Sequence, residues 1–199
     1  MSNIIQLKRS AIQGNTPTVG ELSLGELCIN TYDGKLFIKK DNGTESIIEV
    51  GSDPWTYVKL SSDYVVSTTT NSDSFLRFTP SASTHYVVEG MLFLQTAATT
   101  TGARPGIKWP TGGINQNIAW VTSSMSDTTF ASRFWGGTTT ANAASTAIGG
   151  ANKSFYGKIE ASFVTSPYPN GDFIITLASE VNGSVARLMT NSFIRYRSI

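Results

Sequence analysis

Apolar and polar residues alternate along much of this chain with a period of two, which is the period of a β-strand. The run 155–165 is the clearest case. One face of that run carries apolar and small residues and the other carries polar ones, so we expect a strand with a single buried face. The residues predicted to point inward are Phe155, Gly157, Ile159, Ala161 and Phe163, and those predicted to point outward are Tyr156, Lys158, Glu160 and Ser162.

Similar short runs recur after residue 54, separated by stretches rich in Ser, Thr, Asn and Gly. No segment carries the apolar stripe of a surface helix, which would repeat every three or four residues. About ten short strands in one segment predict an all-β fold, an antiparallel β-sandwich of the jelly-roll-like kind. The expected strands are residues 55–60, 64–67, 75–78, 86–95, 118–122, 130–135, 155–165, 173–179, 185–189 and 193–197.

Residues 1–50 predict a separate, small β-meander module. Asp33-Gly34 stands between two apolar runs and indicates a β-hairpin, because Asp-Gly suits a type I′ turn, in which both central residues have positive φ. A second turn is expected at residues 41–43, and residues 51–54 form the expected linker to a domain of residues 55–199. A module of about 50 residues has a thin core, so we expect it to pack on another subunit or another protein.

The charge pattern does not favour a nucleic-acid or membrane partner. Lys and Arg number 15 against 14 Asp and Glu, the net charge is +1, and neither sign is clustered. No run approaches the ~18 apolar residues of a membrane span. Residues 1–10 have a short apolar stretch that precedes their charges, which is not the order of a secretory signal. We therefore expect no nucleic acid, no membrane insertion, and assembly in the cytoplasm where the chain is made.

The residue types that dominate enzyme sites are scarce. The one histidine, His85, is expected at the start of a strand, and the one cysteine, Cys28, is either a small apolar residue or the site of an intermolecular disulfide. No catalytic, cofactor-binding or metal-binding residue is predicted, because one His and one Cys do not make a tetrahedral zinc site. A glycosidase needs two carboxyl groups, so a polysaccharide-degrading enzyme stays open as an alternative. The candidate carboxylates are Glu89, Glu160 and Glu180.

The stretch 99–113 is the most distinctive part of the sequence, because it combines several Gly and two Pro residues with Arg104, Lys108 and Trp109. One interpretation is a host or partner contact platform, with Trp109 as a stacking face and Arg104 as a hydrogen-bond donor. The other is a rigid crossover in which Trp109 fills the core. In both, Pro105 and Pro110 are expected outside any central strand.

One further segment is a candidate for host contact, and two further tryptophans are not. Residues 136–152, rich in Gly, Thr and Ala, are expected to form one long loop, and loops at the ends of a sandwich are a common place for binding. This loop is therefore the second candidate for a host contact. Trp120 and Trp135 lie in strand-like runs and are expected in the core.

Residues 4–50 resemble the N-terminal module of many phage tail-fibre and virion proteins. The shared features are the strand Leu7-Lys8-Arg9-Ser10 and the pattern L-x-x-G-E-L-x-I-N-x-x-D-G-K-L-F-x-K, which runs from Leu22 to Lys39, with Cys28 where alanine is usual. Residues 55–199 are similar to a second domain of phage structural proteins. Its marks here are residues 55–60, 86–90, 102–112 and 192–197.

The resemblance implies a virion protein without a catalytic motif, whose N-terminal module lies at the particle-proximal end. Fibres and decorations are usually trimers, so it also implies a homotrimer. The expected partners are other virion proteins (tail, portal-proximal or capsid) and a host-surface glycan. The leading interpretation is a fibre subunit. The alternatives are a capsid decoration protein without receptor binding, a polysaccharide-degrading enzyme, and a lectin-like protein outside any particle.

Overall fold

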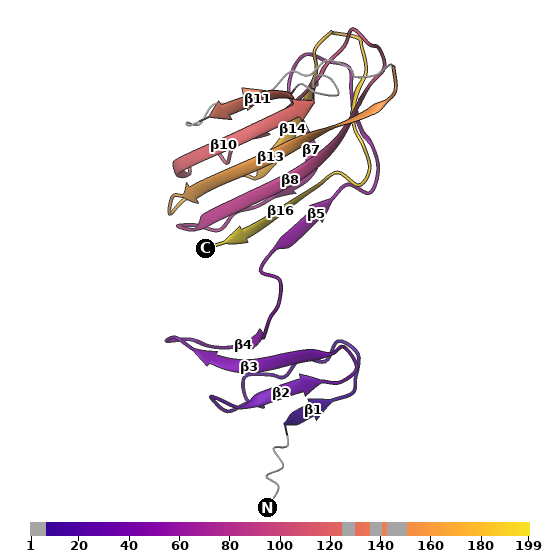
Figure 1. Ribbon diagram of the computed structural model, residues 1–199. Helices are drawn as coiled ribbons and strands as arrows, with labels where there is room; N and C mark the ends of the chain where they lie inside the picture. The colour runs from indigo at the N-terminus through magenta and orange to yellow at the C-terminus, as the bar shows by residue number, and fades with distance from the viewer. Residues whose placement is uncertain (1–6, 125–129, 136–140, 143–150) are drawn as a thin grey trace, which may run out of the picture. The chain divides into compact units, whose positions relative to one another are not determined.

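The computed structural model is described here for residues 7–124, 130–135, 141–142 and 151–199 (Figure 1), with side chains for residues 7–122 and 151–199. All regular structure in these ranges is β-strand, which confirms the predicted all-β class. The described ranges contain no helix long and apolar enough to cross a membrane. The chain divides into two compact units, Met1–Pro54 and Trp55–Ile199, and the boundary falls at the end of the predicted linker 51–54.

The first unit contains one four-stranded sheet in the order β1-β2-β3-β4. The last three strands form the predicted antiparallel meander, and β1 adds to its edge in parallel with β2. A segment of residues 11–26 separates β1 from β2 and supplies Leu22 to one face of the sheet. The strands are β1 (Lys8–Ser10), β2 (Leu27–Asn30), β3 (Lys35–Asp41) and β4 (Glu45–Glu49).

The turn between β2 and β3 differs from the predicted two-residue type I′ turn. The hairpin closes on the pair Asn30 and Lys35, so the loop has the four residues 31–34. The Asn30 side-chain oxygen accepts hydrogen bonds from the backbone N–H groups of Tyr32 (2.9 Å) and Asp33 (3.1 Å). Of the loop residues only Gly34 has a positive φ, 67°. The Asn30 side chain holds the longer turn, so Asp33 need not adopt the left-handed conformation that a type I′ turn requires.

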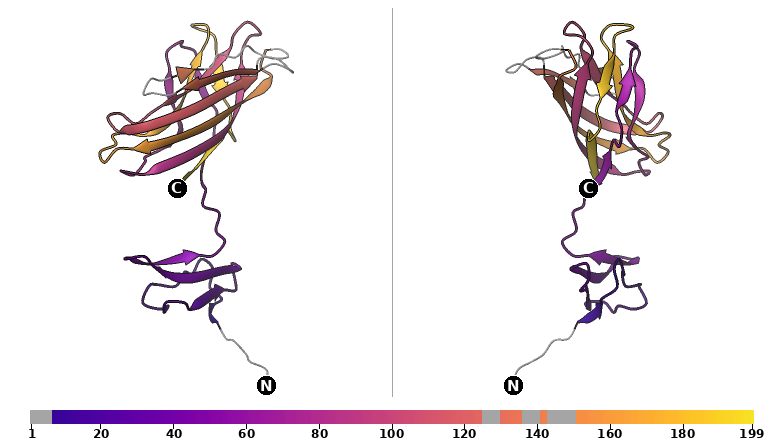
Figure 2. Two further views of the ribbon diagram at one scale, coloured as in Figure 1. Left: turned by 60° about the vertical axis from the view of Figure 1, so that its left-hand side comes forward. Right: turned by 90° about the vertical axis from the view of Figure 1, so that its right-hand side faces the viewer.

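The second unit is a β-sandwich of an eight-stranded and a four-stranded sheet, and Figure 2 shows its two layers. All ten runs predicted after residue 54 lie on strands. The eight-stranded sheet contains β5 (Thr56–Lys59), β6 (Tyr64–Val66), β8 (His85–Thr96), β10 (Ile114–Ser124), β11 (Phe130–Trp135), β13 (Ser154–Thr165), β15 (Ala186–Leu188) and β16 (Phe193–Ser198). The four-stranded sheet contains β7 (Ser72–Phe78), β9 (Ala103–Lys108), β12 (Ala141–Asn142) and β14 (Phe173–Ser179).

Strand β8 organises the larger sheet. Strand β13 pairs along nearly its whole length on one side, and on the other side β16 and β15 pair with successive parts of it. From β7 to β15, consecutive strands cross from one sheet to the other at every connection except the β10–β11 hairpin. Such crossing gives the sandwich its jelly-roll-like character and makes most strand pairs antiparallel neighbours that are distant in sequence.

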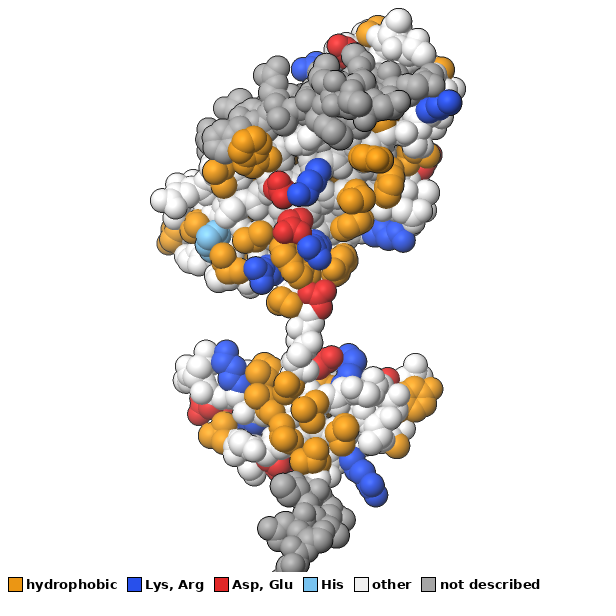
Figure 3. All heavy atoms as spheres, in the orientation of Figure 1, with side chains coloured by type: hydrophobic (Ala, Val, Ile, Leu, Met, Phe, Trp, Pro, Cys, Tyr) orange, Lys and Arg blue, Asp and Glu red, His pale blue; other side chains and the backbone are white. Residues whose placement is uncertain are grey.

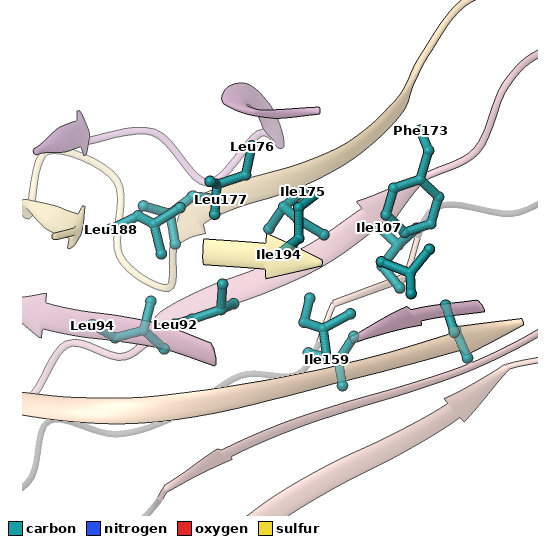
Figure 4. Close-up of a cluster of buried hydrophobic side chains, with 14 of the residues drawn as sticks. Leu76, Leu92, Leu94, Ile107, Ile159, Phe173, Ile175, Leu177, Leu188 and Ile194 are labelled. Carbon is teal, nitrogen blue, oxygen red and sulfur yellow. The ribbon is translucent and has the colours of Figure 1, made fainter. Parts of the chain in front are cut away.

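The core lies between the two sheets, and Figure 4 shows aliphatic and aromatic side chains from both layers meeting there. The inward face predicted for residues 155–165 is confirmed, because all its members are buried and the opposite residues are exposed or half-buried. Ring stacking adds an aromatic end to this core. The labelled members of the cluster are Leu76, Leu92, Leu94, Ile107, Ile159, Phe173, Ile175, Leu177, Leu188 and Ile194.

Strand β9 contains Pro105, which was expected outside any central strand. Pro105 stands opposite Leu177 of β14 in a continuous register from residue 103 to residue 108. On the other side of β9, strand β12 pairs only with Gly106 and Ile107. The proline therefore sits where β9 is an edge strand, and an edge position does not need the N–H group that proline lacks.

The second unit is expected to fold alone, because its core is drawn entirely from residues 55–199. A fragment of these residues should melt in one cooperative transition in differential scanning calorimetry. A fragment that is unfolded, or that melts without cooperativity, would contradict the division of the chain at residue 54.

Candidate functional site

Trp109 belongs to the core and not to a contact platform. Its side chain is 5% exposed. Its ring makes edge contacts with Phe163 and Phe173, with centroids 5.5 Å away in each case. These two phenylalanines come from opposite sheets, so Trp109 joins the layers at one end of the sandwich. The structure thus favours the interpretation of residues 99–113 as a rigid structural element at this position.

Arg104 and Lys108 lie on the side of the four-stranded sheet that points away from the core, four residues apart on β9. The Lys108 ammonium group binds the Asp73 carboxylate at 2.6 Å. The Arg104 side chain is half-buried, and its Nε atom is buried without a hydrogen-bond partner. Trp109 points to the opposite side of the sheet. The structure therefore separates the three predicted contact residues and does not bring them into one platform.

Trp120 was expected in the core. The structure corrects this expectation, because the Trp120 side chain is 46% exposed. It lies on β10 between Ala119 and Val121, which are the residues of that strand that point into the core. Trp120 therefore lies on the outer face of the eight-stranded sheet. Other large apolar side chains of this face are also exposed, and Figure 3 shows hydrophobic side chains on the second unit near a group of charged ones. They include Tyr57, Met91, Ile118 and Tyr156, exposed by 43–60%.

A single row of cross-strand neighbours runs through the middle of this face. It connects five strands in the order β5, β16, β8, β13 and β10. Side chains directly opposite on adjacent strands lie close enough to interact. The row begins and ends with an aromatic ring and has charged groups between them. Its members are Tyr57, Arg195, Glu89, Glu160 and Trp120.

Arg195 fixes one half of this row. Its Nη2 and Nε atoms donate to the same Glu89 oxygen at 2.6 and 3.0 Å, and Nη1 donates to the Tyr57 hydroxyl at 3.4 Å. The hydrogen bond to Tyr57 and the carboxylate of Glu89 raise the pKa of Arg195 above its ordinary value. The guanidinium carbon also lies 4.6 Å from the centre of the Trp55 ring, a cation–π contact. These contacts hold the Glu89 carboxylate in a defined position on the open face.

Glu89 and Glu160 are direct cross-strand neighbours, and each binds a cation of its own. Carboxylates opposite one another repel, so the Lys158 ammonium group, 2.6 Å from Glu160, and Arg195 stabilise the pair. The third candidate carboxylate, Glu180, lies elsewhere and accepts a hydrogen bond from the Gly102 N–H at 2.8 Å. Sequence reasoning had no signal for the Glu89–Glu160 pair, since it depends on the register between two strands about 70 residues apart.

His85 begins β8, as expected, and its Nε2 atom is 2.8 Å from the Ser162 hydroxyl oxygen. The neighbouring part of the face contains a shallow hollow of about 300 Å³. A second hollow, of about 380 Å³, lies on the other side of the charged row. The first is lined by Val87, Val88, Glu89, Ile118, Trp120, Glu160, Ala161 and Ser162. The second is lined by Met91, Thr122, Tyr156, Gly157 and Lys158.

We call this surface the outer face, defined by the charged row and the two hollows. Its chemistry suits non-covalent binding to a broad surface. Exposed aromatic rings offer flat apolar contacts, and fixed carboxylates accept hydrogen bonds. Within the described part of the chain, no three His, Cys, Asp or Glu side chains gather as a metal ion would require. Most of the other predicted contact segment, residues 136–152, lies outside the described residues.

No protein-family model matches the chain, and neither a curated protein nor a solved structure does.

Proposed function

We propose that this chain is a structural subunit of a tailed-bacteriophage particle, attached through residues 1–50, with the sandwich of residues 55–199 exposed for contact with the host surface. The observation that carries the proposal is the outer face, where Trp120, Tyr156 and Met91 are open to solvent on a rigid sheet. Large apolar and aromatic side chains that a sheet leaves exposed on one face are typical of a contact site. The pattern in residues 4–50, which resembles the N-terminal module of phage virion proteins, supports the particle.

A host-surface glycan fits the hollow beside Trp120. The indole ring can pack on the apolar side of a sugar ring, and Glu89, Glu160 and Ser162 can bond its hydroxyl groups. The hollow is open and shallow, which suits repeated weak contacts. Three copies of the chain in one fibre would multiply such contacts, because linked sites raise the overall affinity.

Labelling of particles tests this proposal. Antibodies raised against residues 55–199 and coupled to gold are expected to decorate intact particles at the tail. Gold label on the head would favour the alternative, a capsid decoration protein, over a fibre subunit. Particles without label, from cells that produce the protein, would overturn the proposal.

Trp120→Ala is expected to reduce adsorption of particles to host cells by about tenfold, which corresponds to about 1.4 kcal/mol of contact free energy. The variant should fold normally, since Trp120 lies outside the core. Tyr168→Ala is the matched control, because Tyr168 is an aromatic residue, 84% exposed, in the loop between β13 and β14, and belongs neither to the charged row nor to the two hollows. If particles with either variant adsorb equally well, the outer face does not contact the host.

A further inference from the structure

Asparagine is followed by glycine three times in this chain, at residues 42–43, 170–171 and 182–183. In each pair the asparagine is exposed and the glycine has a positive φ, between 82° and 99°. Glycine lets the backbone nitrogen come close to the side-chain amide of the asparagine, because no Cβ atom stands in the way. The three pairs therefore share the local features that favour deamidation, the conversion of the amide to a carboxylate. Their hydrogen bonds are what distinguishes them.

The peptide group between Asn170 and Gly171 is bonded through its carbonyl oxygen. The pair lies in the loop between β13 and β14, where Asn170 forms an isolated bridge with Thr111. The Asn170 carbonyl oxygen accepts hydrogen bonds from the Thr111 N–H at 2.7 Å and from the Thr111 hydroxyl at 3.1 Å. With the described residues, neither the Gly171 N–H nor the Asn170 side-chain amide makes a hydrogen bond. Both reacting groups of this pair are thus available to each other.

In the other two pairs the glycine N–H is bonded. The Gly183 N–H donates to the Ser67 carbonyl oxygen at 2.7 Å. The Gly43 N–H donates to the Asp41 carboxylate at 2.9 Å. A nitrogen whose proton is held in a hydrogen bond loses that bond before it can react, which costs free energy. Beside Asp41 a deprotonated nitrogen would also stand next to a like charge, and a like charge disfavours the charged form.

We infer that Asn170 is a site of spontaneous deamidation, in which the backbone of the chain is the nucleophile. The Gly171 nitrogen gives its proton to water and attacks the carbonyl carbon of the Asn170 side chain. A bond forms between them, and the side-chain nitrogen takes a proton from water and leaves as ammonia. Water then adds to either carbonyl carbon of the resulting cyclic imide, and the bond from that carbon to the Gly171 nitrogen breaks. One water is consumed, one ammonia is released, and aspartate or isoaspartate remains.

Thr111 stabilises the reactive form of this peptide group. When the Gly171 nitrogen loses its proton, the negative charge spreads onto the Asn170 carbonyl oxygen. That oxygen is the atom to which both Thr111 donors bind. Donors that already point at an atom where charge develops lower the free energy of the charged state. Thr111 is therefore a positioning residue for the reaction, and Asn170 should be the fastest of the three asparagines to convert.

The products change the end of the sandwich near Trp109. Isoaspartate lengthens the backbone by a methylene group and takes the carbonyl that binds Thr111 out of the main chain. Both products add a negative charge to a hollow of about 340 Å³ whose lining includes Lys108 and Asp172. Because Thr111 follows Trp109 closely in the sequence, loss of the bridge is expected to lower the melting temperature of aged protein.

Ageing of the purified full chain tests this inference. The chain is kept at mildly alkaline pH in water labelled with a heavy oxygen isotope, and the peptides that contain each pair are followed by mass spectrometry. Asn170 is expected to convert at least about tenfold faster than Asn42 and Asn182, a factor that corresponds to about one hydrogen bond. Its products should carry oxygen from the labelled water. In guanidinium chloride the three pairs should convert at similar rates, because the hydrogen bonds that distinguish them are lost.

Thr111→Val is the matched variant, because it removes the hydroxyl donor and keeps the N–H donor and the size of the side chain. It should slow the conversion of Asn170 by about threefold or more and leave Asn42 and Asn182 unchanged. The inference is wrong if Asn170 in the folded natural chain converts no faster than the other two. It is also wrong if a folded Thr111→Val chain converts Asn170 at the natural rate or faster. If Thr111→Val does not melt cooperatively, the order of the three pairs in the natural chain decides alone.

Discussion

Replacing Trp109 with alanine is expected to lower the free energy of unfolding of the sandwich by about 3–5 kcal/mol. The loss has two parts, the burial free energy of the apolar ring that is deleted and the cavity that remains beside Phe163 and Phe173. Those rings stack on each other with centroids 5.4 Å apart, so they cannot both move into the space. Denaturant unfolding of the full chain, followed by circular dichroism, measures the change.

Trp120→Ala is the matched control for this experiment, because it removes the same side chain from a position that is 46% exposed. It should change the free energy of unfolding by less than about 1 kcal/mol. If both variants unfold at the same denaturant concentration, the assignment of Trp109 to the core and Trp120 to the outer face is wrong.

Gly90→Val is expected to destabilise the sandwich by about 3 kcal/mol, through overpacking. Gly90 lies in the middle of β8 between Ile159 and Ile194. A Cβ atom at this position would stand 2.9 Å from the Ile194 Cγ2 atom and 3.0 Å from the Phe193 carbonyl oxygen. The carbonyl belongs to the backbone of β16, so relief requires the two strands to move apart. A lower midpoint in the same denaturant titration would show the effect.

Met91→Val on the same strand separates this clash from a general effect of valine. Met91 is 47% exposed on the outer face, and β-branched residues suit strands. Its midpoint should stay close to that of the natural chain. Gly90→Val with a natural midpoint would mean that β16 does not lie against β8 as described.

Sequence periodicity predicted the parts of the fold where only one face of a strand is apolar. In residues 155–163 the polar positions Lys158, Glu160 and Ser162 all fall on one side, so the alternation alone identifies the buried face. Along 118–122 both faces carry apolar residues, with Ile118 and Trp120 on one side and Ala119 and Val121 on the other. Periodicity cannot choose between them. The choice is made by the register with β13, which places Trp120 beside the charged Glu160.

Strand β9 and the outer face show a second limit of the sequence. Gly and Pro residues hide a strand from pattern analysis, and Pro105 is tolerated because β12 pairs with only two residues of its neighbour. The Glu89–Glu160 pair likewise arises from long-range pairing. Strand β3 is different, since the alternation of Leu36 and Ile38 with Lys35 and Lys39 is visible in the sequence itself.

The pairing of the first strand of the sandwich with the last has a consequence for how the protein is made. Strand β5 pairs with β16, and β16 also pairs with residues 86–91 of β8. The ribosome must therefore release residues 193–198 before the sheet can close, and a nascent chain that lacks these residues cannot complete the sandwich. A product of premature termination would leave β5 single and the long edge of β8 bare, and bare edges of this kind invite aggregation.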